Sequence, residues 1–328
     1  MSRPLLSIII AMYNIRDYIG ECIDSCANQE GVESEDYEII VVNDGSTDDS
    51  AEVAAQHVGK HDSVTLLNKP NGGLSDARNY GFKHAKGQYV WFVDGDDLIS
   101  KNSVATIIDA IKSNAQLYII DYSELYQDLS HKEIKFSSQR LPDGIFDAHH
   151  LIASHKISFP PLMAWLQIQK RTFIEENELD FLVGAKSEDL EYSVKLFAKA
   201  TEVQHIKSCL YYYRTNREGS IINVLKNDEK WISNLIRIFD SCSNYLNSHI
   251  DKNDKYTLTS LYIIIATLLY SLYSQKGEEF KLSKRTIKKR GVPVSNILLK
   301  VRHRASLFIW LIYCFMPDFV GRMLLNRR

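Results

Sequence analysis

The chain has 328 residues, of which 45% are hydrophobic and 24% are charged, a balance that is typical of a folded globular protein and excludes general disorder. The formal net charge of −2 conceals an asymmetry, because residues 276–328 carry 13 Lys and Arg but 3 Asp and Glu, while the rest of the chain is net acidic. Five scattered cysteines argue against a disulfide framework, and the first residues lack the pattern of a secretory signal, so we expect a cytoplasmic protein.

Strand-like and helix-like segments alternate through the first hundred residues. The strand candidates are short apolar runs, as expected for strands that are buried on both faces of a parallel sheet. The alternation predicts an α/β fold with a doubly wound sheet and right-handed crossovers. The predicted strands span residues 5–12, 37–42, 64–67 and 88–93, and the predicted helices span residues 17–27, 49–58 and 74–85.

Polar clusters follow three of the predicted strands, at Tyr13–Asn14, Asp44–Gly45 and Asp94–Asp97. In open parallel sheets ligands bind outside the carboxyl ends of the strands, so we expect these clusters to meet at one edge. Neighbouring carboxylates repel one another, and a hard divalent cation that in turn holds a phosphate would stabilise them. The alternative is a polar loop whose carboxylates are solvated or cap the next helix. No glycine-rich dinucleotide or P-loop motif is present.

Four segments together resemble the motifs of family 2 glycosyltransferases with the GT-A fold: Ser7–Asn14, Ile39–Asp48, Asn71–Asn79 and Phe92–Asp97. The resemblance covers about the first 125 residues. One departure is Ala11, where many members have proline, and this alters the stiffness of the turn more than the chemistry. The resemblance implies a mixed, mostly parallel sheet and transfer of a sugar, with inversion, from a nucleoside diphosphate donor that is usually UDP-linked. It also implies a divalent metal, Mn²⁺ or Mg²⁺.

The same resemblance implies roles for the donor-side residues. Tyr13 and Asp44 would contact the base and ribose, and Asp44 would accept a hydrogen bond from the uracil ring. Arg78 would help to hold the nucleotide, and Asp94, followed by Gly95, would contact the ribose.

The metal ligands implied by the resemblance lie in the same motif. Asp96 would ligate the metal on the diphosphate, with Asp94 or Asp97 nearby. For Asp97 the alternative is a helix cap.

The acceptor half contains a second candidate for chemistry. Residues 188–197 predict a helix that Ser187 can cap, and Glu188 and Asp189 fall in its first turn, where the helix dipole favours carboxylates. That electrostatic role is the structural alternative. The resemblance implies instead that Asp189 is the general base, with Glu188 as the second choice. Inverting transfer needs a carboxylate to accept the proton of the acceptor hydroxyl.

Three further features of the acceptor half leave alternatives open. Residues 122–136 alternate unevenly and are read as edge strands. Trp165 either stacks on a pyranose ring or belongs to the core. Arg214 resembles part of an element that closes over the active site, where it would contact a diphosphate oxygen, or else it is a solvated surface residue.

The remaining residues predict helices and a basic tail. Residues 231–246 and 256–273 have helical apolar spacing. Residues 307–316 are apolar but about half the length needed to cross a bilayer, and basic residues precede them, which describes an interfacial helix on an anionic membrane. The alternative is a helix docked on the catalytic domain. We therefore divide the chain into a catalytic domain (1–225, with halves at about 1–125 and 126–225), a helical region (226–290) and a membrane-associating tail (291–328).

Taken together, the sequence predicts a hexosyltransferase that acts on a glycan or lipid-linked glycan during synthesis of a surface polysaccharide, at the inner face of the cell membrane. No nucleic-acid partner is expected. Two other classes remain as alternatives. One is a non-catalytic glycan-binding or scaffold protein on the same fold. The other is a different nucleotide-sugar enzyme, such as a nucleotidyltransferase.

Overall fold

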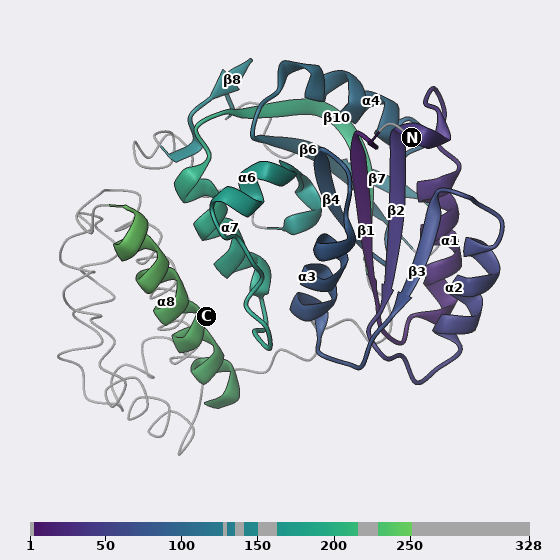
Figure 1. Cartoon of the computed structure of the whole chain (residues 1–328), viewed down its shortest axis with the longest axis horizontal. Coiled ribbons are helices and arrows are strands. Elements are labelled where there is room, and N and C mark those ends of the chain that lie inside the picture. Colours follow the sequence, from purple (N-terminus) through teal and green to yellow (C-terminus); the bar gives the residue numbers. More distant parts are fainter. Residues whose placement is uncertain (1–2, 127–129, 135–140, 150–162, 216–228, 251–328) are drawn as a thin grey trace, which may run out of the picture. The chain divides into compact units, whose positions relative to one another are not determined.

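The computed structural model describes residues 3–126, 130–134, 141–149, 163–215 and 229–250. The chain divides into two compact units, Met1–Glu218 and Gly219–Arg328. The first unit is built on one mixed sheet, and the part of the second unit that is described is one helix (Figure 1).

The first half of the sheet follows the predicted alternation closely. Its four strands lie in the order β3-β2-β1-β4, and all three pairings are parallel. Helices α1 and α2 lie on one side of these strands and α3 on the other (Figure 1). The elements are β1 (Leu6–Met12), α1 (Arg16–Ala27), β2 (Tyr37–Asn43), α2 (Ser50–Val58), β3 (Val64–Asn68), α3 (Leu74–His84) and β4 (Tyr89–Asp94).

The second half extends the same sheet in the order β4-β9-β6-β10-β5. Strand β9 is antiparallel to both of its neighbours, so β6 and β10 run in the same direction as β4. The predicted mixed, mostly parallel sheet is confirmed. The elements are β5 (Leu98–Ile99), α4 (Ser103–Ala110), β6 (Leu117–Leu125), β7 (His131–Ile134), β8 (Ile145–Phe146), β9 (Gln167–Lys170), α6 (Arg171–Glu176), α7 (Glu188–Lys199) and β10 (Val203–Arg214).

The reading of residues 122–136 as edge strands is wrong for the first part of that range. Strand β6 lies inside the sheet, and β7 pairs with its second half. The sequence pattern misleads because β6 buries Asp121 and Ser123, which interrupt its apolar run. Asp121 can be buried because His205 of β10 contacts its carboxylate at 2.9 Å.

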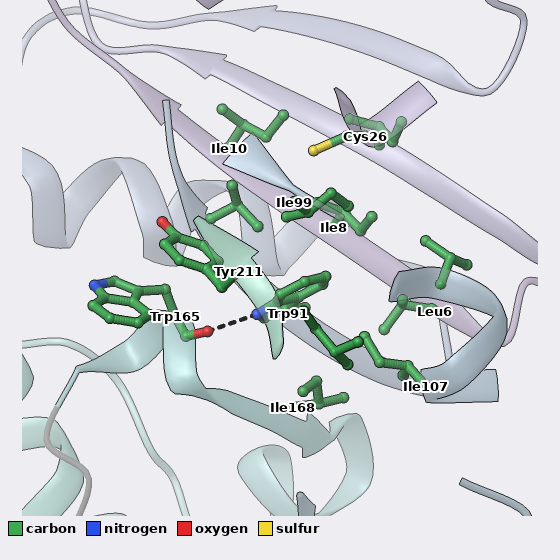
Figure 2. Packing of buried hydrophobic residues seen from close by; sticks show 14 of the residues in the cluster. Leu6, Ile8, Ile10, Cys26, Trp91, Ile99, Ile107, Trp165, Ile168 and Tyr211 are labelled. Atoms are coloured by element: carbon green, nitrogen blue, oxygen red, sulfur yellow. Dashed lines mark hydrogen bonds between the residues drawn. The ribbon is translucent and has the colours of Figure 1, made fainter. Parts of the chain in front are cut away.

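The core lies on both faces of the sheet. On one face, alternate residues of β1 and β4 pack against α1 and α4, and Trp91 donates a hydrogen bond to the Trp165 carbonyl at 2.8 Å (Figure 2). On the other face α3 approaches so closely that a Cβ on Gly81 would lie 2.4 Å from Ile9. Each fully buried aliphatic side chain contributes about 1.5–3 kcal/mol. The buried hydrophobic side chains in the middle of the strands therefore stabilise the sheet, while polar residues lie at the strand ends.

The second unit contains α8 (Glu229–His249), which confirms the helix predicted at 231–246. Its buried residues include Leu235, Ile238, Cys242 and Leu246, which recur at helical spacing. The helix predicted at 256–273 and the basic tail at 291–328 lie outside the described residues. Within the described part of the chain, no helix has the length and apolar character that crossing a membrane requires.

Candidate active site

The polar clusters converge at one edge of the sheet, as the parallel arrangement predicts. Met12 of β1 lies opposite Asn43 of β2, and Ala11 lies opposite Asp94 of β4. The Asp44 amide donates a hydrogen bond to the Met12 carbonyl at 2.9 Å, so the loops that leave β1 and β2 stay in contact. The residues that follow each of these three strands therefore share one site.

Arg78 of α3 joins the two halves of this site. Its Nη2 donates to Asp94 at 2.7 Å, and its Nη1 donates to Glu188 at 2.9 Å and to Asp189 at 2.7 Å. Its side chain is only 2% exposed, and the guanidinium lies over the ring of Phe181. One buried cation thus contacts three carboxylates, two of them from residues more than a hundred positions away.

The charges around Arg78 change the proton affinities of these groups. Burial lowers the pKa of Arg78, but the carboxylates of Asp189, Asp94 and Glu188 outweigh burial, so its pKa is raised and it stays charged. Burial, together with the Glu188 and Asp94 carboxylates, raises the pKa of Asp189 to about 7, although Arg78 opposes the shift. A carboxyl that titrates near neutral pH can both take and release a proton under physiological conditions.

The helix that carries Glu188 and Asp189 is fixed by contacts on both sides of its first turn. Before the first turn, the side-chain amide of Asn79 donates to the Phe181 carbonyl and accepts from the Phe181 backbone amide, both at 2.9 Å. After the first turn, the Tyr192 hydroxyl of α7 donates to the Gln169 side chain of β9 at 2.5 Å. Ser187 occupies the N-cap position, but its side chain makes no capping hydrogen bond. The expected Ser187 cap is therefore wrong, and packing holds α7 in place.

Asp44 is held by the loop that precedes α3. Its carboxylate accepts from the Gly72 amide at 2.9 Å, from the Gly73 amide at 2.7 Å and from Lys69 at 2.5 Å. Burial lowers the pKa of Lys69, but its hydrogen bonds to Asp44 and Asp76 outweigh burial and raise it. The carboxylate that is predicted to bind the uracil ring thus also anchors the loop that precedes α3. Sequence reasoning missed Lys69, although a basic residue directly after the third strand was a possible signal.

Tyr13 directly follows β1 and is 48% exposed, which makes it one of the few large exposed hydrophobic residues in the described part of the chain. Asn14 follows with a left-handed backbone, and its amide oxygen accepts from the Thr47 amide at 2.8 Å. These contacts fix the backbone beside Tyr13. An exposed aromatic ring on a fixed backbone can stack on a planar base.

The turn after β4 carries Asp94, Gly95, Asp96 and Asp97. A Cβ on Gly95 would lie 2.8 Å from the Ala11 carbonyl oxygen, so only glycine fits here. The helix-cap alternative for Asp97 is wrong, because α4 begins at Ser103 behind β5. Asp97 is buried, and burial together with the Asp96 and Asp94 carboxylates raises its pKa well above the usual range.

The donor atoms of this turn fit a divalent cation of the type that is shared with a ligand. Mg²⁺ and similar ions are often held by one or two carboxylates while phosphates and water complete the shell. Asp94 is 25% exposed and Asp96 is half-buried, whereas the Asp97 carboxylate faces β10. Among the described residues no cluster of three or more His, Cys, Asp or Glu forms a complete protein site. Asp96 and Asp94 therefore fit a metal that a diphosphate helps to bind.

The structure resolves the alternatives for two other residues. Trp165 is buried and stacks on Tyr211 at 4.4 Å between ring centroids, so it belongs to the core (Figure 2). Arg214 is not a solvated surface residue, because its side chain is 10% exposed and its Nε donates to the Asp96 carbonyl at 2.9 Å.

The fold and the site together define an α/β protein in which carboxylates gather at one edge of the sheet and Arg78 links Asp94 at this edge to Asp189, a carboxyl group of raised pKa. Residues 7–153 match the model of glycosyl transferase family 2. The part of the chain from residue 7 to residue 153 is thus assigned to this family.

Two curated relatives indicate where the similarity lies. The uncharacterised glycosyltransferase EpsJ of Bacillus subtilis is 33% identical over 217 residues, which are 65% of this chain and 62% of EpsJ. The poly(ribitol-phosphate) beta-glucosyltransferase of Bacillus spizizenii is 30% identical over 226 residues, which are 67% of this chain and 33% of that protein. The matched part of the chain thus spans less than two thirds of either relative.

Two solved structures share the fold. TarS (residues 1–349) of S. aureus has a TM-score of 0.70 at 17% identity, covering 98% of this chain and 91% of TarS, and it is also solved with UDP and with UDP-GlcNAc. The mannosyltransferase PcManGT of Pyrobaculum calidifontis, solved with GDP-Man and Mn²⁺, has a TM-score of 0.53 at 12% identity, covering 99% of this chain and 88% of that one. The predicted GT-A fold is confirmed.

Proposed function

We propose that the chain is a hexosyltransferase that transfers a sugar, with inversion, from a UDP-linked donor to a glycan or lipid-linked glycan. The observation that carries the proposal is the Arg78 cluster, in which Asp94 at the donor edge and Asp189 of the acceptor half contact the same buried guanidinium. Burying a charge is costly unless the charge is paired. A carboxyl whose pKa is raised to about 7 at this edge supports proton transfer at the site rather than glycan binding alone.

The donor nucleotide binds at the ends of β1, β2 and β4 in this proposal. Tyr13 stacks on the base, Asp44 and its loop contact the base and ribose, and Asp94 with Gly95 approaches the ribose. The Arg78 side chain is enclosed, so its contribution to donor binding is to fix Asp94. TarS supports UDP as the nucleotide, because that relative is solved with UDP and UDP-GlcNAc.

The transfer step assigns a proton movement to Asp189. The carboxylate of Asp189 takes the proton of the acceptor hydroxyl as its oxygen attacks the anomeric carbon, and the bond from that carbon to the diphosphate oxygen breaks on the opposite side. Glu188 shares Arg78 with Asp189 and keeps its pKa high, which strengthens the base. A divalent metal, Mn²⁺ or Mg²⁺, held by Asp96 and Asp94 would supply Lewis-acid stabilisation of the departing UDP. The Mn²⁺ in PcManGT supports this choice.

The setting that we propose is synthesis of a surface polysaccharide at the inner face of the cell membrane. The name of the Bacillus spizizenii relative, which is a poly(ribitol-phosphate) beta-glucosyltransferase, supports a polymeric acceptor. The basic residues of 291–328 would hold the chain on anionic lipid, since each Lys or Arg near such a surface contributes about 1 kcal/mol. If so, deletion of residues 291–328 shifts the chain from the membrane fraction to the supernatant. An unchanged distribution would refute the membrane role.

Nucleotide binding tests the proposed function against both alternatives. UDP with Mn²⁺ is expected to raise the melting temperature by several degrees, because a ligand at 100 times its Kd stabilises by about 2.7 kcal/mol. Thermal shift measurements with UDP, GDP and free glycans, each with Mn²⁺ or with EDTA, make the comparison. A shift by glycans alone would favour the binding protein. Release of pyrophosphate from UTP and a sugar phosphate would favour the nucleotidyltransferase.

The pH dependence of transfer follows from the raised pKa of Asp189. A general base works only when deprotonated, so kcat/KM is expected to fall about tenfold per pH unit below about pH 7 and to level off above it. Because Glu188 raises this pKa, Glu188→Gln is expected to move the midpoint to lower pH. UDP release measured from pH 5.5 to 9 gives both profiles. A profile that is flat between pH 5.5 and 8 would contradict the role of Asp189.

A further inference from the structure

Residues of β10 form hydrogen bonds to the turn that carries Asp94 and Asp96. Within the turn, the Asp97 amide donates to the Asp94 carbonyl at 3.0 Å. The chain then continues as β5, which pairs antiparallel with β10, so that Ile99 lies opposite Tyr211. The pairing of β5 with β10 therefore fixes the end of the turn to a strand that is distant in sequence.

Tyr211 contacts both ends of the turn with one hydroxyl group. It donates to the Asp97 carboxylate at 2.6 Å and accepts from the Asp94 amide at 3.2 Å. The ring is fully buried and lies almost parallel to Trp165, with 10° between the planes (Figure 2). The hydroxyl thus has a fixed position from which to hold the turn.

Arg214, three residues further along β10, also forms hydrogen bonds to the turn. Its amide donates to the Asp97 carboxylate at 2.7 Å, and its Nε donates to the Asp96 carbonyl at 2.9 Å. The guanidinium also pairs with Glu21 of α1 at 2.8 Å and lies over the ring of Tyr18. The turn is consequently tied to α1 as well as to β10.

These contacts oppose a repulsion that the sequence creates. Three carboxylates within four residues repel one another and favour a turn that opens. The Asp97 carboxylate is directed toward Tyr211 and the Arg214 amide, and the backbone at Asp94 and Asp96 is fixed by β10. Binding groups that are held in place before the ligand arrives cost less to order on binding.

We propose that Tyr211, Asp97 and Arg214, here called the β10 clasp, are positioning residues that hold Asp94 and Asp96 in the geometry that binds a metal–nucleoside diphosphate complex. The inference rests on the proposed function, since it deepens the role of the same site. The clasp acts through the backbone and side chains of the turn.

The test compares two substitutions, each of which removes the hydroxyl of a buried tyrosine. Tyr211→Phe removes the hydroxyl that holds the turn. Tyr89→Phe is the matched control, because Tyr89 is also buried and donates to a backbone carbonyl, that of Ala115, at 3.0 Å. Calorimetric titration measures the affinity for UDP with Mn²⁺ and for UDP with EDTA. Tyr211→Phe is expected to weaken UDP binding with Mn²⁺ about tenfold, because it removes both hydrogen bonds of the hydroxyl to the turn, and to change metal-free binding less than twofold.

The outcomes separate the clasp from the proposed function. If the parent binds UDP with Mn²⁺ and Tyr211→Phe binds it equally well, or if Tyr89→Phe loses as much affinity, the clasp is overturned. A parent chain that binds no UDP would overturn the proposed function and the clasp with it. Should Tyr211→Phe not fold, Arg214→Lys takes its place, because lysine keeps the positive charge but loses the Nε bond to Asp96. The same selective loss supports the clasp, and unchanged binding refutes it.

Discussion

Replacement of Asp189 by asparagine is expected to slow UDP-dependent sugar transfer by about 10²–10⁴-fold, the usual contribution of a general base. Asparagine has nearly the same shape and can still accept a hydrogen bond from Arg78, so donor binding should persist. Folding should persist as well, because the raised pKa of Asp189 shows that its surroundings disfavour the ionised form. Steady-state UDP release measures the loss.

Two matched variants make the Asp189 result specific. Glu188→Gln removes the neighbouring carboxyl, which contacts the same guanidinium, and is expected to lower the rate less than Asp189→Asn. Asp109→Asn changes an exposed carboxyl on α4 that pairs with Lys112 of the following turn, and it should leave the rate unchanged. If Glu188→Gln proved the more damaging substitution, Glu188 would be the base instead.

Replacement of Arg78 by methionine is expected to cost about 3–5 kcal/mol of unfolding free energy at pH 8, because removing one partner of a buried ion pair leaves uncompensated charge. Three carboxylates would lose their shared cation. The deficit should shrink at pH 5.5, since the pKa of Asp189 is already raised and without Arg78 the Asp189 carboxyl protonates more readily. Urea unfolding at the two pH values measures both effects.

Arg171 provides the control for this substitution. It pairs with Glu175, which is 45% exposed, and its Nε also donates to the Gly87 carbonyl at 3.0 Å. An ion pair with an exposed partner typically contributes about 0–1 kcal/mol, because water screens the charge. Arg171→Met should therefore cost much less than Arg78→Met. An Arg78→Met chain as stable as the parent at pH 8 would show that the cluster does not depend on its cation.

The first half of the fold could be predicted because its signals are local. Each strand is a short apolar run, and each turn residue lies within a few positions of the strand that it ends, so the polar clusters at Tyr13, Asp44 and Asp94 mark the carboxyl edge directly. The parallel register then brings them together without further information.

The contacts that join the site residues could not be predicted, because they connect distant parts of the chain. Arg78 meets Glu188 and Asp189 across about 110 positions, and Asp97 meets Tyr211 across 114. The sequence resemblance implies that Arg78 is a nucleotide contact. The position of Asp97 ahead of a helical segment suggests a helix cap. Similarly, Asp121 concealed the interior strand β6 because its partner His205 lies on β10.

The role of Asp189 as the general base is the central claim. It is tested most directly by measuring UDP binding and UDP release, both with Mn²⁺, for the parent chain and for Asp189→Asn. The account predicts that both chains bind UDP within about twofold of each other and that the variant releases UDP from its sugar donor at least about 10²-fold more slowly. Equal rates of release in the two chains would contradict it.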